Sequence, residues 1–391
     1  MCRTLVVFGV VCAGAAAAPG QQNPSHSFGP GQCGPVDPAY ISTANATGGV
    51  PLFLQRSEAG KAMQLMREST RPNTSTVLWA SAKLTGAPQA FEVPVDSAMQ
   101  RITFTFSVDT KSIRLVLKRP DGQLVGEGSE RTEDTELNCG RIITVDKPEA
   151  GVWSAEVTGS GTYWLAAEGQ SDIYFIKAEF VELGGRPGHE GLFRIHGQPI
   201  AGQPAILQAS LSATETKTTE FTFVSEQGDI LQKLKMKVTD PDREFMEFTG
   251  DVTLPNVPFR IAVSGRDAKG MRYQRFDGPL SRAETVQVIP RLNFDEIAPG
   301  ASKEALFEVR NLGPARNFKV MVTDAQRFVG GVNPTELAIP EHGSGFVHVQ
   351  LTAPGTAKPY SRDDLVFVAN SISGAPTTNS AIVQLEVPGG N

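Results

Sequence analysis

The chain has 391 residues and carries 36 basic against 42 acidic residues, which gives a formal net charge of −6. This length is too great for one ordinary core, because domains average roughly 150 residues, and it predicts several modules. No basic run and no Arg/Lys patch with interleaved aromatic residues is present, which argues against nucleic acid as a partner. With 40% hydrophobic residues, 39 Gly and 27 Pro, the composition is that of a folded β-rich chain with many turns.

The first residues have the pattern of a secretory signal peptide, predicted to cover 1–18. Arg3 precedes an apolar run from Leu5 to Ala18, and small and then polar residues follow it. The run is shorter than the about 20 apolar residues that span a bilayer, and no later segment is long enough. We therefore expect a secreted protein with no membrane span in the mature chain. An uncleaved membrane anchor is the alternative, because Pro19 is a poor residue directly after a cleavage site.

Cysteine usage agrees with secretion. Removal of the signal peptide takes away Cys2 and Cys12 and leaves only Cys33 and Cys139. In an oxidising compartment a disulfide between these two is favoured, and a loop of this length would stabilise the fold by roughly 4–5 kcal/mol in the chain-entropy model. Two free thiols remain the alternative, because the sequence does not show whether their Cα atoms approach each other.

Residues 19–39 are rich in Pro, Gly and small polar residues and are predicted to form an extended leader. The next segment, 40–86, reads as strand, helix, strand. "GGVPLFL" predicts a short buried strand, and "STVLWASAKLTG" predicts a second one. Between them a helix is expected over Ser57 to Glu68, with Ser57 as N-cap and Pro72 after its end. Its apolar residues fall at i, i+3, i+4 and i+7, namely Ala59, Ala62, Met63 and Met66.

From Ala87 onward the apolar residues alternate with a period of two. In "RITFTFSVD", Ile102, Phe104 and Phe106 alternate with polar residues, which predicts a strand with one buried face. Turn signals recur every 8 to 12 residues, as in β-sandwich domains of about 100 residues. We predict a mainly β fold of tandem immunoglobulin-like or jelly-roll-like sandwiches after the strand, helix, strand piece. The expected sandwiches cover 87–182, 190–288 and 290–388.

The order and spacing of several segments resemble a known family. They are "ISTANATGGVPLFL", the helix, "TVLWASAKLTG", "FEVPVDSAMQRITFTFSVD", "LVLKRPDGQLV", "KPEAGVWSAEVTGSGTYWLAAEG", "PFRIAVSGRDAKGMRYQR" and "FEVRNLGPARNFKVMVTD". Together, over about 40 to 385, they resemble the region at and after the end of the von Willebrand factor A domain in hemicentin-like extracellular proteins. The resemblance implies that 40–86 is the closing piece of an A domain, an α/β unit, with Thr47, Gly48 and Gly49 at its Thr-Gly-Gly stretch.

The resemblance also bears on metal binding. The metal-ion-dependent adhesion site of A domains needs a D-x-S-x-S loop and a later Thr and Asp, all before this point, and the chain has no D-x-S-x-S. We therefore expect no metal site, no cofactor and no magnesium-dependent binding. The apolar strands "VPLFL" and "VLWASAKL" are expected to dock onto the first sandwich or to pair with another chain.

Catalytic motifs are scarce, and the sequence predicts no catalytic residue and no enzyme. His189 and His196 are seven residues apart, which does not match the spacing of a zinc protease helix. No nucleophile elbow, P-loop or dinucleotide fingerprint is present. The acidic pairs Asp240/Asp242 and Asp363/Asp364 are either turn residues or calcium ligands at a domain junction. Three tryptophans are either core residues or a glycan-binding surface: Trp79, Trp153 and Trp164.

Two sequons, at Asn45 and Asn73, are predicted to carry glycans if the host is eukaryotic, whereas Asn333 is excluded by Pro334. Three functions remain open. The chain is a secreted, non-enzymatic, multi-module protein of the extracellular matrix or cell surface that binds other proteins through its sandwiches, or an accessory β-sandwich region of a secreted hydrolase, or a structural spacer.

Overall fold

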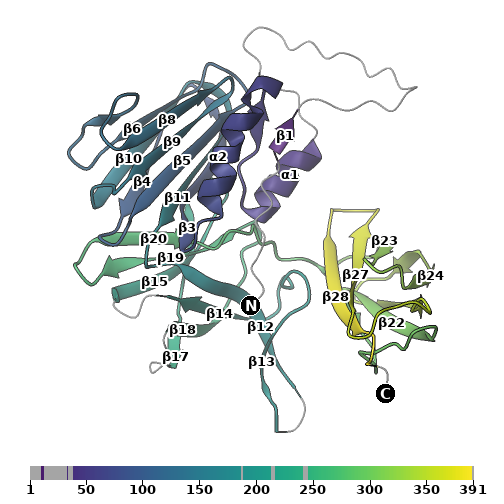
Figure 1. Cartoon of the computed structure of the whole chain (residues 1–391). Helices are drawn as coiled ribbons and strands as arrows, with labels where there is room; N and C mark the ends of the chain where they lie inside the picture. The colour runs from purple at the N-terminus through teal and green to yellow at the C-terminus, as the bar shows by residue number, and fades with distance from the viewer. Residues whose placement is uncertain are drawn as a thin grey trace, which may run out of the picture. The chain divides into compact units, whose positions relative to one another are not determined.

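The computed structural model describes residues 10–12, 33, 38–185, 188–212, 216–240 and 245–389. Strands dominate these residues, which contain two α-helices (Figure 1). The mainly β fold with sandwich modules, expected from the sequence, is confirmed. The predicted signal peptide (1–18) and leader (19–39) lie outside the described residues, apart from 10–12, Cys33 and the start of the first helix.

Two compact units divide the chain, the first made of Met1–Glu179 and Ile206–Ser281 and the second of Phe180–Ala205 and Arg282–Asn391. In the first unit the elements up to residue 179 are β1 (Val10–Cys12), α1 (Pro38–Thr47), β2 (Leu52–Leu54), the 3-10 turn η1 (Arg56–Glu58), α2 (Ala59–Ser69), β3 (Thr74–Thr85), β4 (Gln89–Val95), β5 (Arg101–Val108), β6 (Arg114–Lys118), β7 (Leu124–Val125), β8 (Thr132–Leu137), β9 (Gly140–Asp146), β10 (Gly151–Thr158), β11 (Ser160–Gln170) and the start of β12 (Phe175–Gly184).

The first unit continues with β14 (Ala205–Leu211), β15 (Thr216–Val224), β16 (Ile230–Leu234), β17 (Lys237–Asp240), β18 (Met246–Val252), β19 (Arg260–Asp267) and β20 (Arg272–Phe276). The second unit holds the end of β12, β13 (Gly191–Arg194), β21 (Val286–Pro290), β22 (Ser302–Asn311), β23 (Arg316–Thr323), β24 (Val329–Asn333), β25 (Glu336–Ile339), β26 (Ser344–Thr352), β27 (Arg362–Ser371) and β28 (Thr378–Glu386).

A nine-stranded sheet is the largest sheet of the first unit. Its strand order is β16-β15-β19-β20-β3-β11-β5-β9-β8. The strand Thr74–Thr85, which the sequence analysis assigns to the strand, helix, strand piece, pairs with β11 along its whole length, from Thr74 opposite Gln170 to Thr85 opposite Ser160. Its partner is therefore a strand some 80 positions later in the chain, a pairing that local periodicity does not reveal.

The first sandwich forms where a four-stranded sheet, β4-β10-β6-β7, packs on one face of this large sheet. The rings of Phe104 on β5 and Trp153 on β10 stack across the interface with centroids 6.3 Å apart. Trp153 is 1% exposed, and its indole N–H donates to the backbone oxygen of Glu149 at 2.8 Å. The alternation expected in the strand around Phe104 thus places its apolar side chains in this core.

The helices cover the opposite face of the nine-stranded sheet. Leu52 and Leu54 of β2 and Leu65 of α2 are buried against Trp79 and Trp164 on the outer side of the sheet. The expected docking of "VPLFL" onto the first sandwich is therefore present within the chain. β2 also pairs in parallel with β1, three residues that fall inside the predicted signal peptide.

Two details of the helical layer differ from the expectation. The helix expected over Ser57 to Glu68 runs as η1 followed by α2, and its start is fixed by Glu58, whose carboxylate accepts from the backbone N–H of Gln55 at 2.9 Å, rather than by Ser57. A further helix, α1, covers Pro38–Thr47, where the end of the leader and the residues before the expected strand "GGVPLFL" lie and no helix was expected. Pro at the first helical position and Gly after the last are the sequence signals that indicate it.

The structure shows why the Thr-Gly-Gly stretch has a glycine at position 48. Gly48 ends α1 with a left-handed backbone at φ +81°, and a Cβ there would lie 2.2 Å from the backbone oxygen of Gly278. Only glycine adopts this conformation and this close approach without strain. The stretch therefore fits α1 against the loop after β20.

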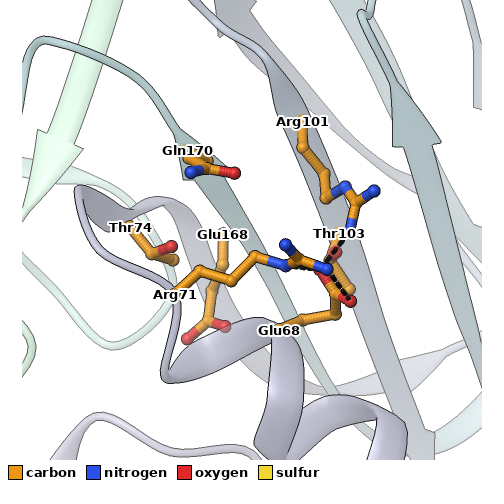
Figure 2. A pocket seen from close by; sticks show the side chains of 7 residues that line it. All are labelled: Glu68, Arg71, Thr74, Arg101, Thr103, Glu168 and Gln170. Carbon is orange, nitrogen blue, oxygen red and sulfur yellow. Dashed lines mark hydrogen bonds and ion pairs between the residues drawn. The ribbon is translucent and has the colours of Figure 1, made fainter.

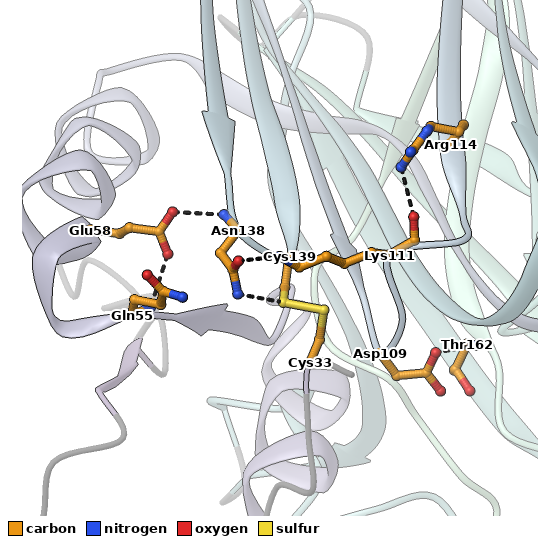
Figure 3. Close-up of a disulfide and its surroundings, with 9 residues drawn as sticks. All are labelled: Cys33, Gln55, Glu58, Asp109, Lys111, Arg114, Asn138, Cys139 and Thr162. Atoms are coloured by element: carbon orange, nitrogen blue, oxygen red, sulfur yellow. Dashed lines mark hydrogen bonds between the residues drawn. A yellow bond between two sulfur atoms is a disulfide. The ribbon is translucent and has the colours of Figure 1, made fainter. Parts of the chain in front are cut away.

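A disulfide between Cys33 and Cys139 lies beside this layer (Figure 3), with the two Cα atoms 5.7 Å apart. The backbone N–H of Cys33 donates to the oxygen of Asp109 at 2.9 Å. On the other side, Glu58 accepts from the backbone N–H of Asn138 at 2.7 Å, next to Cys139. The bond and the two hydrogen bonds tie Cys33, the end of η1 and the β8–β9 turn to one place.

The second part of the first unit shares the nine-stranded sheet and adds a second sheet, in which β12, β14, β18 and β17 follow one another. Phe221 packs edge-on against Phe248 at 4.9 Å, and the rings of Phe223 and Phe259 lie 4.5 Å apart. Among the described residues, one ladder pair, Phe276 opposite Thr76, makes the nine-stranded sheet continuous between this core and the first sandwich.

A buried ion pair reinforces that joint. Asp96, after β4, pairs with Arg275 of β20, and both side chains are completely buried. Arg275 also donates from Nε to the oxygen of Ile173 and from Nη1 to the oxygen of Gln274, each at 2.7 Å. The other carboxylate oxygen of Asp96 accepts from the Ser171 hydroxyl at 2.9 Å. Each charge is therefore paired and hydrogen-bonded, as a buried ion requires.

The second unit is a sandwich of two four-stranded sheets, β21-β22-β26-β24 and β25-β23-β27-β28. Phe307 and Phe367 stack across its core with centroids 4.4 Å apart. The segment after β13 belongs to this unit, because the Asn379 side chain accepts from the backbone N–H of Gln198 at 2.8 Å and donates to its oxygen at 3.0 Å.

We expect Asp96→Asn to lower the free energy of unfolding by about 3 kcal/mol, because it leaves the buried Arg275 guanidinium without a counter-charge. Glu92→Gln is the matched control. Glu92 also pairs with β20, through Arg272, but the two side chains are 67% and 45% exposed, and its loss should change stability by less than about 1 kcal/mol. Urea unfolding followed by tryptophan fluorescence measures both, since all three tryptophans lie in the first unit. Equal losses in the two variants would contradict this role for the buried pair.

Candidate functional site

A small polar pocket lies between the end of α2 and the outer face of the nine-stranded sheet (Figure 2). Its cavity of about 10 Å³ has room for one water molecule and not for a sugar or peptide side chain. The lining side chains are polar, and two acids and two arginines meet there. They are Glu68, Arg71, Thr74, Arg101, Thr103, Glu168 and Gln170.

Glu68 is the centre of the pocket's ion pairs. Arg71 donates from Nε to its carboxylate at 2.7 Å, and Arg101 on β5 donates from Nη1 at 2.8 Å. Burial works against the charge of Glu68, but the two guanidiniums outweigh it and lower the pKa of Glu68. This network fastens the last turn of α2 to the sheet.

Glu168 on β11 has no such partner. Burial raises the pKa of Glu168 to about 7. The hydroxyl of Thr74, which also lines the pocket, is buried and has no hydrogen-bond partner among the described residues. The chemistry available here is the binding and release of one proton near neutral pH. The pocket lines up no nucleophile with a base, so it does not form a catalytic constellation.

The residues singled out in the sequence lie apart from this pocket. His189, His196, His342 and His348 are exposed, and His26 lies outside the described residues. Across the described part of the chain no group of three or more His, Cys, Asp or Glu is placed to hold a metal ion. The tryptophans are core residues, with Trp79 1%, Trp153 1% and Trp164 4% exposed, which leaves no glycan-binding surface to them.

The acidic pairs do not converge on a cation. Asp363 is buried and accepts from the backbone N–H groups of Ala325 and Gln326 at 3.0 and 2.9 Å, whereas Asp364 is exposed and accepts from Gln384 at 3.0 Å. Burial raises the pKa of Asp363, and the neighbouring Asp324 adds to that rise. Asp363 therefore holds the β23–β24 turn. Asp240 is the last residue of β17, and Asp242 lies outside the described residues.

The two sequons differ in exposure. Asn73 is exposed in the turn before β3, where it adopts a left-handed backbone at φ +60°. Asn45 lies on α1, and its side-chain oxygen is buried without a hydrogen-bond partner. Its backbone oxygen accepts from the buried Arg260, whose guanidinium stacks 3.9 Å from the Trp79 ring. Burial lowers the pKa of Arg260 to about 10.

An apolar feature lies on the outer face of the sheet β25-β23-β27-β28 in the second unit. Met321 and Ile382 are 50% and 53% exposed there. Val368 lies opposite Met321, and Val366 lies opposite Ile382, so the four form one apolar stripe across three strands. Contiguous exposed apolar patches larger than a few hundred Å² mark protein contact sites, and this stripe is a candidate for such a site.

Sequence reasoning missed Glu168. The signal that could have indicated it is the stretch "TYWLAAEGQ", where apolar residues flank the acid on both faces of one strand. A carboxylate inside such a doubly buried strand is expected to lose hydration and gain a higher pKa.

The raised pKa of Glu168 predicts a loss of stability as pH rises. The folded state holds the proton up to about pH 7, whereas the unfolded chain releases it near pH 4.5, so unfolding releases a proton in this window and stability falls across it. We expect a fall on the order of 1–3 kcal/mol from this group. In Glu168→Gln the melting temperature at pH 7.5 should rise and the fall between pH 5 and pH 7.5 should shrink. Glu133→Gln, exposed on β8, is the control, and an unchanged pH profile in Glu168→Gln would refute the assignment.

Comparison with known families gives two matches. The family profile described as "Hemicentin galactose-binding domain-like" matches residues 75–172, which runs from β3 to the end of β11. The profile described as "VWA7 Ig-like domain" matches residues 288–389, the sandwich of the second unit. The first match begins at β3 and so agrees with the pairing of β3 inside the sandwich.

Curated relatives agree with these matches. The chain is 22% identical to human Hemicentin-1 over 265 residues, 67% of this chain and 4% of that protein. It is 23% identical to human von Willebrand factor A domain-containing protein 7 over 358 residues, 86% of this chain and 38% of that protein. The chain therefore spans a small part of each relative.

Solved structures add little. A Bacillus licheniformis lipase in propeptide form matches 52% of this chain and 40% of its own, with 13% identity and a TM-score of 0.26. An elastase-activated Escherichia coli alpha-2-macroglobulin matches 79% of this chain and 32% of its own, with 10% identity and the same TM-score. Similarity this low carries no argument. The family profiles and the curated relatives confirm the resemblance expected from the sequence: residues 75–172 are similar to a hemicentin galactose-binding-like domain, and residues 288–389 are similar to a VWA7 Ig-like domain.

Proposed function

We propose that this chain is a secreted, non-enzymatic, multi-module protein of the extracellular matrix or cell surface, and that it binds other proteins through the surfaces of its sandwiches. The similarity to hemicentin and to von Willebrand factor A domain-containing protein 7 supports this class of protein. The signal-like N-terminal sequence supports secretion. None of the helices among the described residues is long and apolar enough to cross a membrane.

One observation carries the proposal, namely the apolar stripe of Met321, Val366, Val368 and Ile382 on the outer face of a sheet. Two of the four side chains are about half exposed. A sheet face that stays in water normally alternates apolar inside with polar outside. Here two apolar cross-strand pairs break that alternation where no described element covers them. A partner protein that covers the stripe would gain the apolar burial that the chain itself does not provide.

Two other functions remain in view. An accessory region of a secreted hydrolase would need a catalytic domain elsewhere in the same protein, and a spacer would need no binding surface at all. The stripe favours binding over a pure spacer role. Loss of matrix binding in a stripe variant distinguishes a binding protein from a spacer, because the function of a spacer would not depend on the stripe.

We expect the purified full chain to bind to a decellularised fibroblast matrix on a plate and to lose at least tenfold in apparent affinity when Met321 and Ile382 are both changed to Asp. Leu124→Asp is the control, because Leu124 is 65% exposed in the first sandwich and outside the stripe. Treating the matrix with protease beforehand should abolish binding if the partner is a protein. Binding that survives in the double variant, or on the protease-treated matrix, would contradict the proposal.

Glycosylation gives a second test of secretion. We expect a eukaryotic secretory line to release the chain with a glycan on Asn73, and with lower occupancy at Asn45, because a glycan there must displace the α1 contact in which its amide oxygen is buried. Asn73→Gln should then remove most of the mobility shift seen on glycosidase digestion, and Asn45→Gln should remove little. Retention of the chain inside the cell, or equal shifts from the two variants, would count against this.

A further inference from the structure

A charged cluster with an aromatic neighbour lies on the outer face of the other sheet of the second unit, β21-β22-β26-β24. Its centre is Glu308 on β22, which points outward because Phe307 and Val309 on either side face the core. Glu308 is nevertheless only 6% exposed. Ile289 of β21 and Phe346 of β26 are its cross-strand neighbours. The cluster therefore spans three adjacent strands.

Two arginines enclose the Glu308 carboxylate. Arg291 donates to Oε2 from Nη2 at 2.6 Å and from Nε at 3.1 Å, and Arg310 donates to Oε1 from Nε at 2.6 Å. The Ser344 hydroxyl donates to Oε1 at 2.9 Å. Arg310 and the other donors outweigh the effect of burial and lower the pKa of Glu308 to about 2, so the carboxylate is ionised at every physiological pH. We name Arg291, Glu308 and Arg310 the arginine clamp.

The arginine clamp has positive charge and N–H donors that Glu308 does not use. Two positive charges meet one negative charge, which leaves an excess of one positive charge. The Arg291 and Arg310 side chains are 46% and 40% exposed, and no described residue accepts a hydrogen bond from the Nη1 group of either. Because Glu308 already fixes both guanidiniums, little side-chain entropy is left to lose when they bind a second anion. Planar guanidiniums fit carboxylates in a bidentate manner.

Phe346 adds an apolar contact beside the clamp. It is 49% exposed and lies directly opposite Glu308 on the neighbouring strand. At the other end of the same face, the Glu304 carboxylate is hydrogen-bonded to His348 Nδ1 at 2.9 Å and accepts from Gln350 Nε2 at 2.6 Å. The excess positive charge therefore lies at the Phe346 end of this face. Exposed Arg next to an exposed aromatic ring is the composition of protein-binding hot spots.

We propose that the arginine clamp and Phe346 form a docking site for an acidic protein segment, whose carboxylate binds the free guanidinium edges while a neighbouring apolar side chain packs on the phenyl ring. This deepens the protein-binding function proposed above and rests on it. The local charge selects an acidic occupant, and the ring favours a protein segment, whose Leu, Ile or aromatic side chain covers a phenyl ring more completely than the C–H groups of a heavily sulfated sugar do. The expected partner therefore carries a Glu or Asp one or two positions from a Leu, Ile or aromatic residue.

The test uses the full chain and a fluorescein-labelled peptide of alternating Glu and Leu as the probe, followed by fluorescence polarisation at 50 and 300 mM salt. We expect saturable binding that weakens at the higher salt, and at least a tenfold loss in the double variant Arg291→Gln, Arg310→Gln and in Phe346→Ala. Arg362→Gln is the matched control, because Arg362 pairs with Glu386 at 3.2 Å on the opposite sheet and should leave binding unchanged. The double variant Arg291→Lys, Arg310→Lys keeps the charge but not the planar fork, so it should lose part of the affinity.

The proposal is overturned if the Glu-Leu peptide does not bind, if a Lys-Leu peptide binds equally well, or if binding is unchanged in the arginine double variant. It is also overturned if heparin displaces the probe and if heparin binding is lost in the arginine double variant but kept in Phe346→Ala. Circular dichroism and melting temperature of each variant show whether it is folded. If matrix binding still depends on Met321 and Ile382 while the acidic peptide does not bind, the clamp assignment fails and the proposed function stands. If neither surface matters, both fail.

Discussion

The first unit depends on the buried pair between Asp96 and Arg275. Its two halves share a nine-stranded sheet, yet at their junction the sheet is continuous through one residue pair, Phe276 opposite Thr76. One ladder position alone defines little of the angle between two sandwiches, and side chains add further contacts, such as the Gln274 amide that donates to the oxygen of Val77 at 3.0 Å. Arg275 supplies what the ladder does not, because its guanidinium binds Asp96, the oxygen of Ile173 and the oxygen of Gln274 at once. Removing either ion would leave a charge in a dry interior, so the pair strongly favours one arrangement of the joint.

Polar contacts also fix the position of the helical layer on the sheet, although none of them is a fully buried ion pair. The layer's apolar strand β2 and helix α2 cover Trp79 and Trp164 on the outer face of the sheet, which would otherwise be a large exposed apolar patch. The polar contacts are placed at the rim of this apolar area. Glu58 and the disulfide fasten one side, and Glu68 with its two arginines fastens another. The segment from α1 to α2 therefore serves as a cover for one face of the first sandwich.

Surface chemistry separates the two units. In the first unit one face of the sheet is packed in a sandwich and the opposite face is covered by helices, and the polar pocket beside α2 has room for one water molecule. In the second unit both outer sheet faces are open to solvent and carry half-exposed apolar side chains, Met321 and Ile382 on one and Phe346 on the other. The sandwich of the second unit is therefore the part of the chain for which we propose contact with other proteins.

The sequence by itself determined the class of the fold, because alternation at Ile102, Phe104 and Phe106 depends only on neighbouring residues and directly reports a half-buried strand. It also located the helix near residues 57–68, whereas the core position of the tryptophans was decided by the tertiary structure. Which strands pair was decided by tertiary structure. Thr74–Thr85 was recognisable as a strand, but its partner β11 lies some 80 residues away, and no local pattern encodes such a pairing. The same holds for the sites. The raised pKa of Glu168 and the clamp around Glu308 both arise from side chains that only the packed sheets bring together, so their chemistry comes from burial and charge neighbours rather than from any motif.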